Sequence, residues 1–155
     1  MSIPVQFAVR DQTVDSNALI DSGAEGQFLD KGFARHHNIP ISPLSRPITA
    51  LNVDGTKNHA GTITHYTWLE LRINNTKIPT RFLITGLGQE NMILGIPWLK
   101  RTKSKTDWAN GILEFTEVPS LRLARAACSA YIASTHIVTS DPDPEPLYID
   151  RKSVV

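Results

Sequence analysis

The sequence lacks the features that mark several large protein classes. It has one cysteine, Cys128, among 155 residues, so no intrachain disulfide can form and nothing indicates an oxidising compartment. Its 16 basic and 15 acidic residues give a formal net charge of +1, which offers no electrostatic basis for binding nucleic acid or a membrane surface. No apolar run approaches the roughly 20 residues of a membrane span, and the N-terminus lacks a signal peptide's basic start and apolar stretch. We therefore expect a soluble, cytoplasmic protein with no membrane and no direct nucleic-acid partner.

Patterns for metal, phosphate or thiol chemistry are also missing. The histidines follow no regular ligand spacing and no cysteine pair accompanies them: His36, His37, His59, His65 and His136. The glycine-containing stretch from Gly23 to Gly26 lacks the Lys-Ser/Thr of a phosphate-binding loop. Cys128 follows two alanines and is more typical of a packing cysteine than of a nucleophile. We expect no metal and no cofactor.

What the sequence does contain is a succession of short strand-like segments. Ile3, Val5, Phe7 and Val9 alternate with more polar residues, which is typical of a half-buried strand. Similar patterns predict further strands at residues 14–20, 48–53, 62–73, 77–85 and 91–95, and a hairpin over residues 107–115. The Asp54-Gly55 pair is a strong hairpin signal. The order favours a mainly β, small closed or folded-over architecture.

Helices are few and the last part of the chain differs from the rest. Residues 27–37 predict a short helix, Pro97 can open another, and the two prolines in residues 41–47 indicate an irregular or edge segment. After Val118 the spacing becomes helical, and the Asp-Pro and Glu-Pro pairs of residues 141–146 indicate an extended linker. We therefore divide the chain into a domain at residues 1–118 and a C-terminal helix and Pro-rich linker at residues 119–155.

The stretch Ala18-Leu19-Ile20-Asp21-Ser22-Gly23-Ala24 contains the strongest candidate for chemistry. An apolar strand ends in a carboxylate and a tight turn, although desolvating a carboxylate is costly unless something compensates. A carboxylate can activate water only if it is fixed and partly desolvated and can share a proton. Ile93-Leu94-Gly95 provides a second apolar strand that ends in glycine. These features favour a hydrolytic role for Asp21 over a simple turn.

The same residues resemble the retropepsin family, the aspartic proteases of retroviruses and LTR retrotransposons, and most of all its gypsy-type branch. The resemblance runs from about Ile3 to Phe115. It depends on the Asp21 stretch, on Val53-Asp54-Gly55 and on Met92-Ile93-Leu94-Gly95-Ile96-Pro97-Trp98-Leu99. It implies a small closed β-barrel-like fold with one or two short helices and one lobe per chain.

The resemblance also implies roles for individual residues. Asp21 is the catalytic aspartate, and Ser22, Gly23 and Ala24 form the active-site loop. Residues 51–63 form a flap. The implied substrate-binding residues are Glu25, Asp54, Gly55 and Ile93, and Gly95 is structural because it lets its strand pass close behind the Asp21 loop. Ile96 stands where retroviral members carry an arginine that supports the acid at the Glu25 position, so the support of Glu25 stays open, and a plain surface glutamate is the alternative.

Hydrolysis by this chemistry needs two carboxylates that share one proton. The sequence has no second Asp-Ser/Thr-Gly, so an active enzyme must be a homodimer with the two Asp21 side chains at its two-fold axis. The resemblance implies residues 3–9 and 112–115 as the intersubunit sheet. We expect an aspartic endopeptidase that cleaves Gag–Pol-type polyprotein junctions in the cytoplasm or within virus-like particles, with a bell-shaped, mildly acidic pH profile. The alternative is a catalytically inactive dimerisation or peptide-binding module of the same fold.

Overall fold

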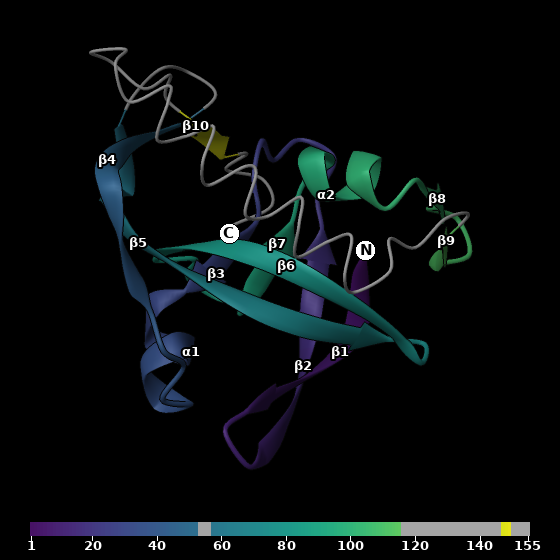
Figure 1. The fold of residues 1–155 in the computed structure, drawn as a ribbon. Coiled ribbons are helices and arrows are strands. Elements are labelled where there is room, and N and C mark those ends of the chain that lie inside the picture. The colour runs from purple at the N-terminus through teal and green to yellow at the C-terminus, as the bar shows by residue number, and fades with distance from the viewer. Residues whose placement is uncertain (53–56, 116–146, 150–155) are drawn as a thin grey trace.

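The computed structural model describes residues 1–52, 57–115 and 147–149, and β-strands dominate these residues (Figure 1). In chain order the strands are β1 (Ser2–Val9), β2 (Gln12–Ile20), β3 (Phe28–Asp30), β4 (Ser42–Asn52), β5 (Lys57–Ile73), β6 (Thr76–Thr85), β7 (Met92–Leu94), β8 (Ser104–Asp107), β9 (Ile112–Phe115) and β10 (Leu147–Ile149). Two helices of six residues each, α1 (Lys31–His36) and α2 (Ile96–Arg101), complete the described elements.

Six strands close into a barrel. Their order is β1-β2-β7-β3-β6-β5, and the ring closes where Gln6 of β1 pairs with Arg72 of β5. β4 continues the sheet beyond β5, and β10 pairs with the outer side of β4. The prediction of a mainly β, small closed barrel with one or two short helices is therefore confirmed.

The strands form where apolar side chains alternate. In β1 the side chains of Ile3, Val5, Phe7 and Val9 are all buried, whereas their neighbours are exposed or half-buried, because successive side chains of a strand point to opposite faces. Asn74-Asn75 connects β5 to β6 with φ values of 48° and 63°. Asparagine tolerates this left-handed region better than most residues, so this pair suits a tight hairpin.

One prediction of local structure is wrong. Residues 27–37 are not one helix: Phe28–Asp30 forms β3, which is parallel to β6 and antiparallel to β7, and the helix begins only at Lys31. Residues 41–47, predicted as irregular or as an edge segment, lead into β4, which begins at Ser42. The outer side of β4 pairs with β10 only at Ala50–Asn52, so among the described strands this part of β4 is an edge, as one of the two alternatives predicted. The two prolines are tolerated there because the pairing of β4 with β5 is interrupted between Pro43 and Ile48.

The interior contains two hydrophobic clusters. The larger fills the barrel and includes Trp98 of α2, which is fully buried and donates its indole Nε1–H to Thr80 Oγ1 at 3.1 Å. Phe115 of β9 packs edge-on against Trp98, with ring centroids 5.9 Å apart, and this contact anchors the β8–β9 hairpin to the barrel. The smaller cluster lies beside the Asp21 loop and contains Ala24 of that loop.

The turn of the β8–β9 hairpin is organised by one carboxylate. Asp107 accepts hydrogen bonds from the side-chain amide of Asn110 at 2.7 Å and from the backbone N–H groups of Asn110 and Ala109, both at 3.1 Å. These donors, the Asn110 side chain first, lower the pKa of Asp107 below its ordinary value of 3.8. The predicted hairpin around Asn110-Gly111 is thus present, and hydrogen bonds to the Asp107 carboxylate span its turn.

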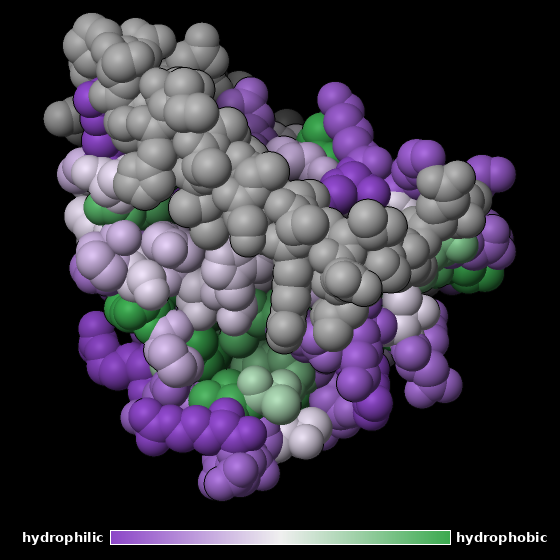
Figure 2. All heavy atoms as spheres, viewed as in Figure 1, coloured by the Kyte–Doolittle hydropathy of each residue, from purple (hydrophilic) through white to green (hydrophobic). Residues whose placement is uncertain are grey.

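In the space-filling view, hydrophobic residues reach the surface in the lower centre of the face and are bordered by hydrophilic ones (Figure 2). Among the described residues no helix is both long and apolar enough to cross a membrane.

The predicted helix after Val118 and the linker at residues 141–146 lie outside the described residues. Within the predicted segment 119–155, the structure describes only the strand β10.

Candidate active site

Asp21 comes directly after β2 and is held by the neighbouring strand. The last residues of β2 pair in parallel with β7, with Leu19 opposite Ile93 and Ile20 opposite Leu94. The backbone N–H of Asp21 then donates to the Leu94 carbonyl at 3.0 Å. The residue is 7% exposed. The predicted arrangement, a buried strand that delivers a carboxylate into a turn, is what the structure contains.

The two carboxylate oxygens of Asp21 have different surroundings. Oδ1 accepts a hydrogen bond from the Gly23 backbone N–H at 2.8 Å, which fixes the side chain within its own loop. Oδ2 is buried and has no hydrogen-bond partner among the described residues. Most buried polar atoms in proteins are hydrogen-bonded, and leaving one without a partner costs about 1–3 kcal/mol. The fold therefore maintains one anchored and one unpartnered carboxylate oxygen at this position.

The loop after Asp21 is closed against the start of α2. Ala24 donates its N–H to the Asp21 carbonyl at 3.3 Å, and its own carbonyl accepts the N–H of Ile96 at 2.9 Å. Gly95 lies against this loop so closely that an added Cβ would be 2.5 Å from the Ala24 carbonyl oxygen and 2.3 Å from that of Gly26. The structure thus places Gly95 directly behind the loop, and only glycine fits there without moving backbone atoms.

The smaller hydrophobic cluster brings the loop together with the β4–β5 hairpin. It contains Ala24 of the loop, Ile93 of β7 and Leu87, together with residues of the two hairpin strands and their neighbours: Phe28, Ala50, Ile63 and Leu83. Ile93, predicted to bind substrate, is fully buried in this cluster. In the single described chain, Ile93 therefore packs in the same cluster as Ala24 of the loop and is not exposed to solvent.

The other predicted site residues differ in exposure, and two of them fall outside the described residues. Ser22, Gly23 and Glu25 are exposed, whereas Ala24 is fully buried. Asp54 and Gly55 fall within residues 53–56, which the structure does not describe. β4 and β5 on either side of them are antiparallel neighbours, with Leu51 opposite Lys57. The predicted flap region therefore begins and ends in paired strands.

Asp30 is a supporting residue that the sequence reading overlooked. Its Oδ2 caps α1 by accepting the Phe33 N–H at 2.9 Å, and its Oδ1 accepts the Leu87 N–H at 2.9 Å. Its own N–H donates to the Asn91 carbonyl at 2.8 Å. Asp30 is therefore hydrogen-bonded to both ends of the segment 87–91, and Leu87 at the start of this segment packs in the smaller cluster. An Asp just before a helix is a recognisable cap signal. Because the predicted helix begins at residue 27, Asp30 falls inside it and does not stand out as a cap.

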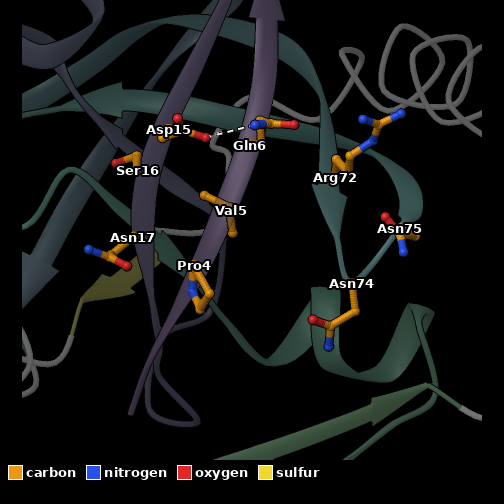
Figure 3. A pocket seen from close by; sticks show the side chains of 9 residues that line it. All are labelled: Pro4, Val5, Gln6, Asp15, Ser16, Asn17, Arg72, Asn74 and Asn75. Carbon is orange, nitrogen blue, oxygen red and sulfur yellow. Dashed lines mark hydrogen bonds between the residues drawn. The ribbon is translucent and has the colours of Figure 1, made fainter.

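An open groove lies elsewhere on the barrel. It has a volume of about 680 Å³ and is lined by Pro4, Val5 and Gln6 of β1, by polar residues of β2, by Arg72 of β5, and by Asn74 and Asn75 of the β5–β6 turn. Figure 3 shows the hydrogen bond between Gln6 and Asp15, at 2.8 Å, on its wall. None of the predicted site residues lines it. Within the described ranges no group of three or more acidic, histidine or cysteine side chains is arranged to hold a metal ion.

Comparison with known proteins identifies the family. The family model described as the PEG10/RTL1 protease domain matches residues 17–121, a range that includes Asp21, the β4–β5 hairpin and Gly95. The chain belongs to the PEG10/RTL1 protease domain family. The resemblance to retroelement proteases that the sequence showed is thereby confirmed, and the chain is a retropepsin-like aspartic protease domain of retrotransposon origin.

One solved structure is also similar to this PEG10/RTL1-type chain. It is the crystal structure of the retroviral protease-like domain of Ddi1 from Leishmania major. The two share 16% sequence identity with a TM-score of 0.48, over 76% of this chain and 90% of that one.

Proposed function

We propose that this PEG10/RTL1-type domain is an aspartic endopeptidase that acts as a homodimer. The observation that carries the proposal is the buried, unpartnered Oδ2 of Asp21. The hydrogen bond from Gly23 to Oδ1 could equally be accepted by an asparagine, so the second carboxylate oxygen has no structural task among the described residues. A retained ionisable oxygen at a fixed, nearly buried position suits proton transfer.

The proposed reaction needs the same carboxylate from two chains. One Asp21 would be ionised and accept a proton from water, while its symmetry mate would be protonated and donate to the substrate carbonyl oxygen. The water oxygen attacks the carbonyl carbon and gives a gem-diol. The Asp21 that took the water proton then donates it to the amide nitrogen, its symmetry mate accepts a proton from a gem-diol hydroxyl, and the C–N bond breaks to leave a carboxylic acid and an amine. Because two adjacent carboxylates cannot both ionise readily, the pair shares one proton over a limited pH range. We therefore propose an activity that falls at both low and high pH.

The exposed residues of the loop fit a site completed by a second chain. Ser22 and Gly23 follow Asp21 and are exposed, so a symmetry mate could cover them. The two predicted intersubunit segments differ in how far their strands are already paired within the chain. Residues 3–9 lie in β1, which pairs with β2 along its length, whereas residues 112–115 form β9, whose described strand partner is β8. We propose the β8–β9 hairpin, with its exposed Trp108 and Ile112, as the main dimer contact.

The proposed substrate is an extended polypeptide, such as a junction in a retroelement polyprotein, held between the β4–β5 hairpin and the Asp21 loop. The test is cleavage of an unbiased peptide library between acidic and neutral pH by the unchanged chain and by Asp21→Asn. Asp15→Asn, the same substitution at an exposed position of β2, is the matched control. We expect cleavage by the unchanged chain and by Asp15→Asn, sensitivity to pepstatin, and none by Asp21→Asn. No cleavage by a chain shown to be dimeric would refute the proposal and favour a peptide-binding module.

A further inference from the structure

The strand β10 has no part in closing the barrel. The ring of six strands closes through β1 and β5, and β10 lies outside it on the far side of β4. Its three residues pair in parallel with the end of β4: Leu147 with Ala50, Tyr148 with Leu51 and Ile149 with Asn52. A three-residue parallel pairing at a sheet edge is a weak attachment, so this contact can form and break without unfolding the barrel.

The edge that β10 covers lies beside the candidate site. Leu51 and Asn52 belong to the predicted flap, and Ala50 is fully buried in the same cluster as Ala24 and Ile93. Through Ala50, this end of β4 belongs to the same hydrophobic cluster as the Asp21 loop. Figure 1 shows β10, in yellow, beside the end of β4. An extended peptide that approaches Asp21 under the hairpin would meet this backbone edge.

We propose that Leu147–Ile149 is an intramolecular occupant of the backbone edge that an extended peptide substrate would use, so that the chain's own C-terminal segment competes with substrate. This inference rests on the proposed function for the identity of the competing ligand. The physical basis is strand addition, in which an unpaired sheet edge takes up an extended segment through main-chain hydrogen bonds. The segment occupies the edge because it is part of the same chain.

Covalent linkage determines how strongly the segment competes. Linking a segment to its binding site gives an effective concentration on the order of 1 mM. If the segment alone binds with a dissociation constant on the order of 0.1 mM, the linked copy weakens binding of the same peptide from solution by about tenfold. Releasing β10 should therefore strengthen binding of an added peptide by about tenfold. This should hold whatever the sequence of the peptide, because the contacts are main-chain ones.

The experiment uses the full-length chain carrying Asp21→Asn, so that no peptide is cleaved during the measurement. Tyr148→Pro is added to release β10, because proline lacks the N–H needed for strand pairing. Ser153→Pro, beyond β10, controls for the effect of a proline in this part of the chain, and Tyr148→Ala controls for loss of the side chain. The probe is a fluorescent peptide with the sequence of residues 143–153, and binding is followed by anisotropy.

We expect the peptide to bind the Tyr148→Pro chain about tenfold more tightly than the parent or either control. Amide hydrogen exchange at residues 50–52 should also accelerate in Tyr148→Pro alone and slow again when peptide is added. Equal peptide affinity in all four chains, or unchanged exchange at residues 50–52, would overturn the inference. Cleavage by the unchanged chain is a separate measurement, so the proposed function and this inference can fail independently.

Discussion

Gly95→Ala tests whether close packing behind the Asp21 loop holds the candidate site together. An added Cβ would lie 2.3 Å from the Gly26 carbonyl oxygen and 2.5 Å from that of Ala24. Non-bonded contacts of a real Cβ atom below 3.0 Å are essentially never seen, so the Gly26 oxygen must retreat by at least the difference, 3.0 − 2.3 = 0.7 Å. Both obstacles are backbone atoms, and moving them displaces the loop that fixes Asp21.

The expected cost of Gly95→Ala follows from two opposing effects. Overpacking of this kind costs typically about 1–3 kcal/mol and occasionally more, whereas replacing glycine by alanine stabilises by about 0.4–1 kcal/mol through the unfolded chain. Gly95 has φ −95° and ψ −170°, which alanine also adopts, so no backbone strain is added. With two carbonyl contacts, overpacking falls in the upper half of that range, about 2–3 kcal/mol, and we expect a net loss of about 1–2.5 kcal/mol, which lowers the melting temperature by roughly 2–10 °C.

The assay combines thermal unfolding at a fixed protein concentration with hydrogen exchange of the Gly23 amide, which donates to Asp21 Oδ1. Gly111→Ala is the matched control: an added Cβ there meets nothing within 4 Å, and only its φ of +65° opposes alanine. We expect Gly111→Ala to cost about 1 kcal/mol without changing exchange at Gly23. If Gly95→Ala were as stable as the unchanged chain, or left Gly23 exchange unaltered, the packing argument would be refuted.

Three further predictions concern the supports of the fold. Trp98→Phe removes the indole donor to Thr80 and should cost about 2–3 kcal/mol, because the buried Thr80 oxygen loses its donor, keeping only its own bond to the Ile78 carbonyl, and a void remains; a loss below about 0.5 kcal/mol in urea unfolding would contradict this. Asp30→Ser keeps a helix cap but cannot also reach Leu87, so exchange of the Leu87 amide should accelerate, and unchanged exchange would rule out the link. The lowered pKa of Asp107 means that its turn gains stability above the ordinary aspartate pKa and loses it as pH falls through the lowered value. An NMR titration in which Asp107 protonates at or above 3.8 would disprove that assignment.

The sequence predicts local features of the fold better than distant ones. Alternating residues such as Ile3, Val5 and Phe7 show β1 because the period of a strand is visible within a few residues. β3 was mistaken for a helix because Phe28 and Leu29 are buried by β6 and β7, which are remote in the sequence. A short apolar run cannot by itself distinguish a buried strand from a helix face.

The same distinction applies to the site. Asp21 stands out because its strand and turn are contiguous with it, whereas the close packing of Gly95 behind the loop was implied by the family resemblance and not by the local pattern. The bond between Asp30 and Leu87 joins residues 57 positions apart, and no local pattern reveals it. The pairing of β10 with β4 was equally hidden, since prolines before Leu147 indicated a linker.

The most direct test of the central claim, that one site is built from two chains, is a subunit-mixing experiment. The unchanged chain and Asp21→Asn are mixed in equal amounts, allowed to exchange subunits, and assayed with a cleavable peptide at constant total protein. If each active site needs Asp21 from both chains, activity falls to about a quarter of that of the unchanged chain, since only that share of random dimers carries both carboxylates. If activity falls only to about half, each chain acts by itself, and the proposed shared pair of aspartates is wrong.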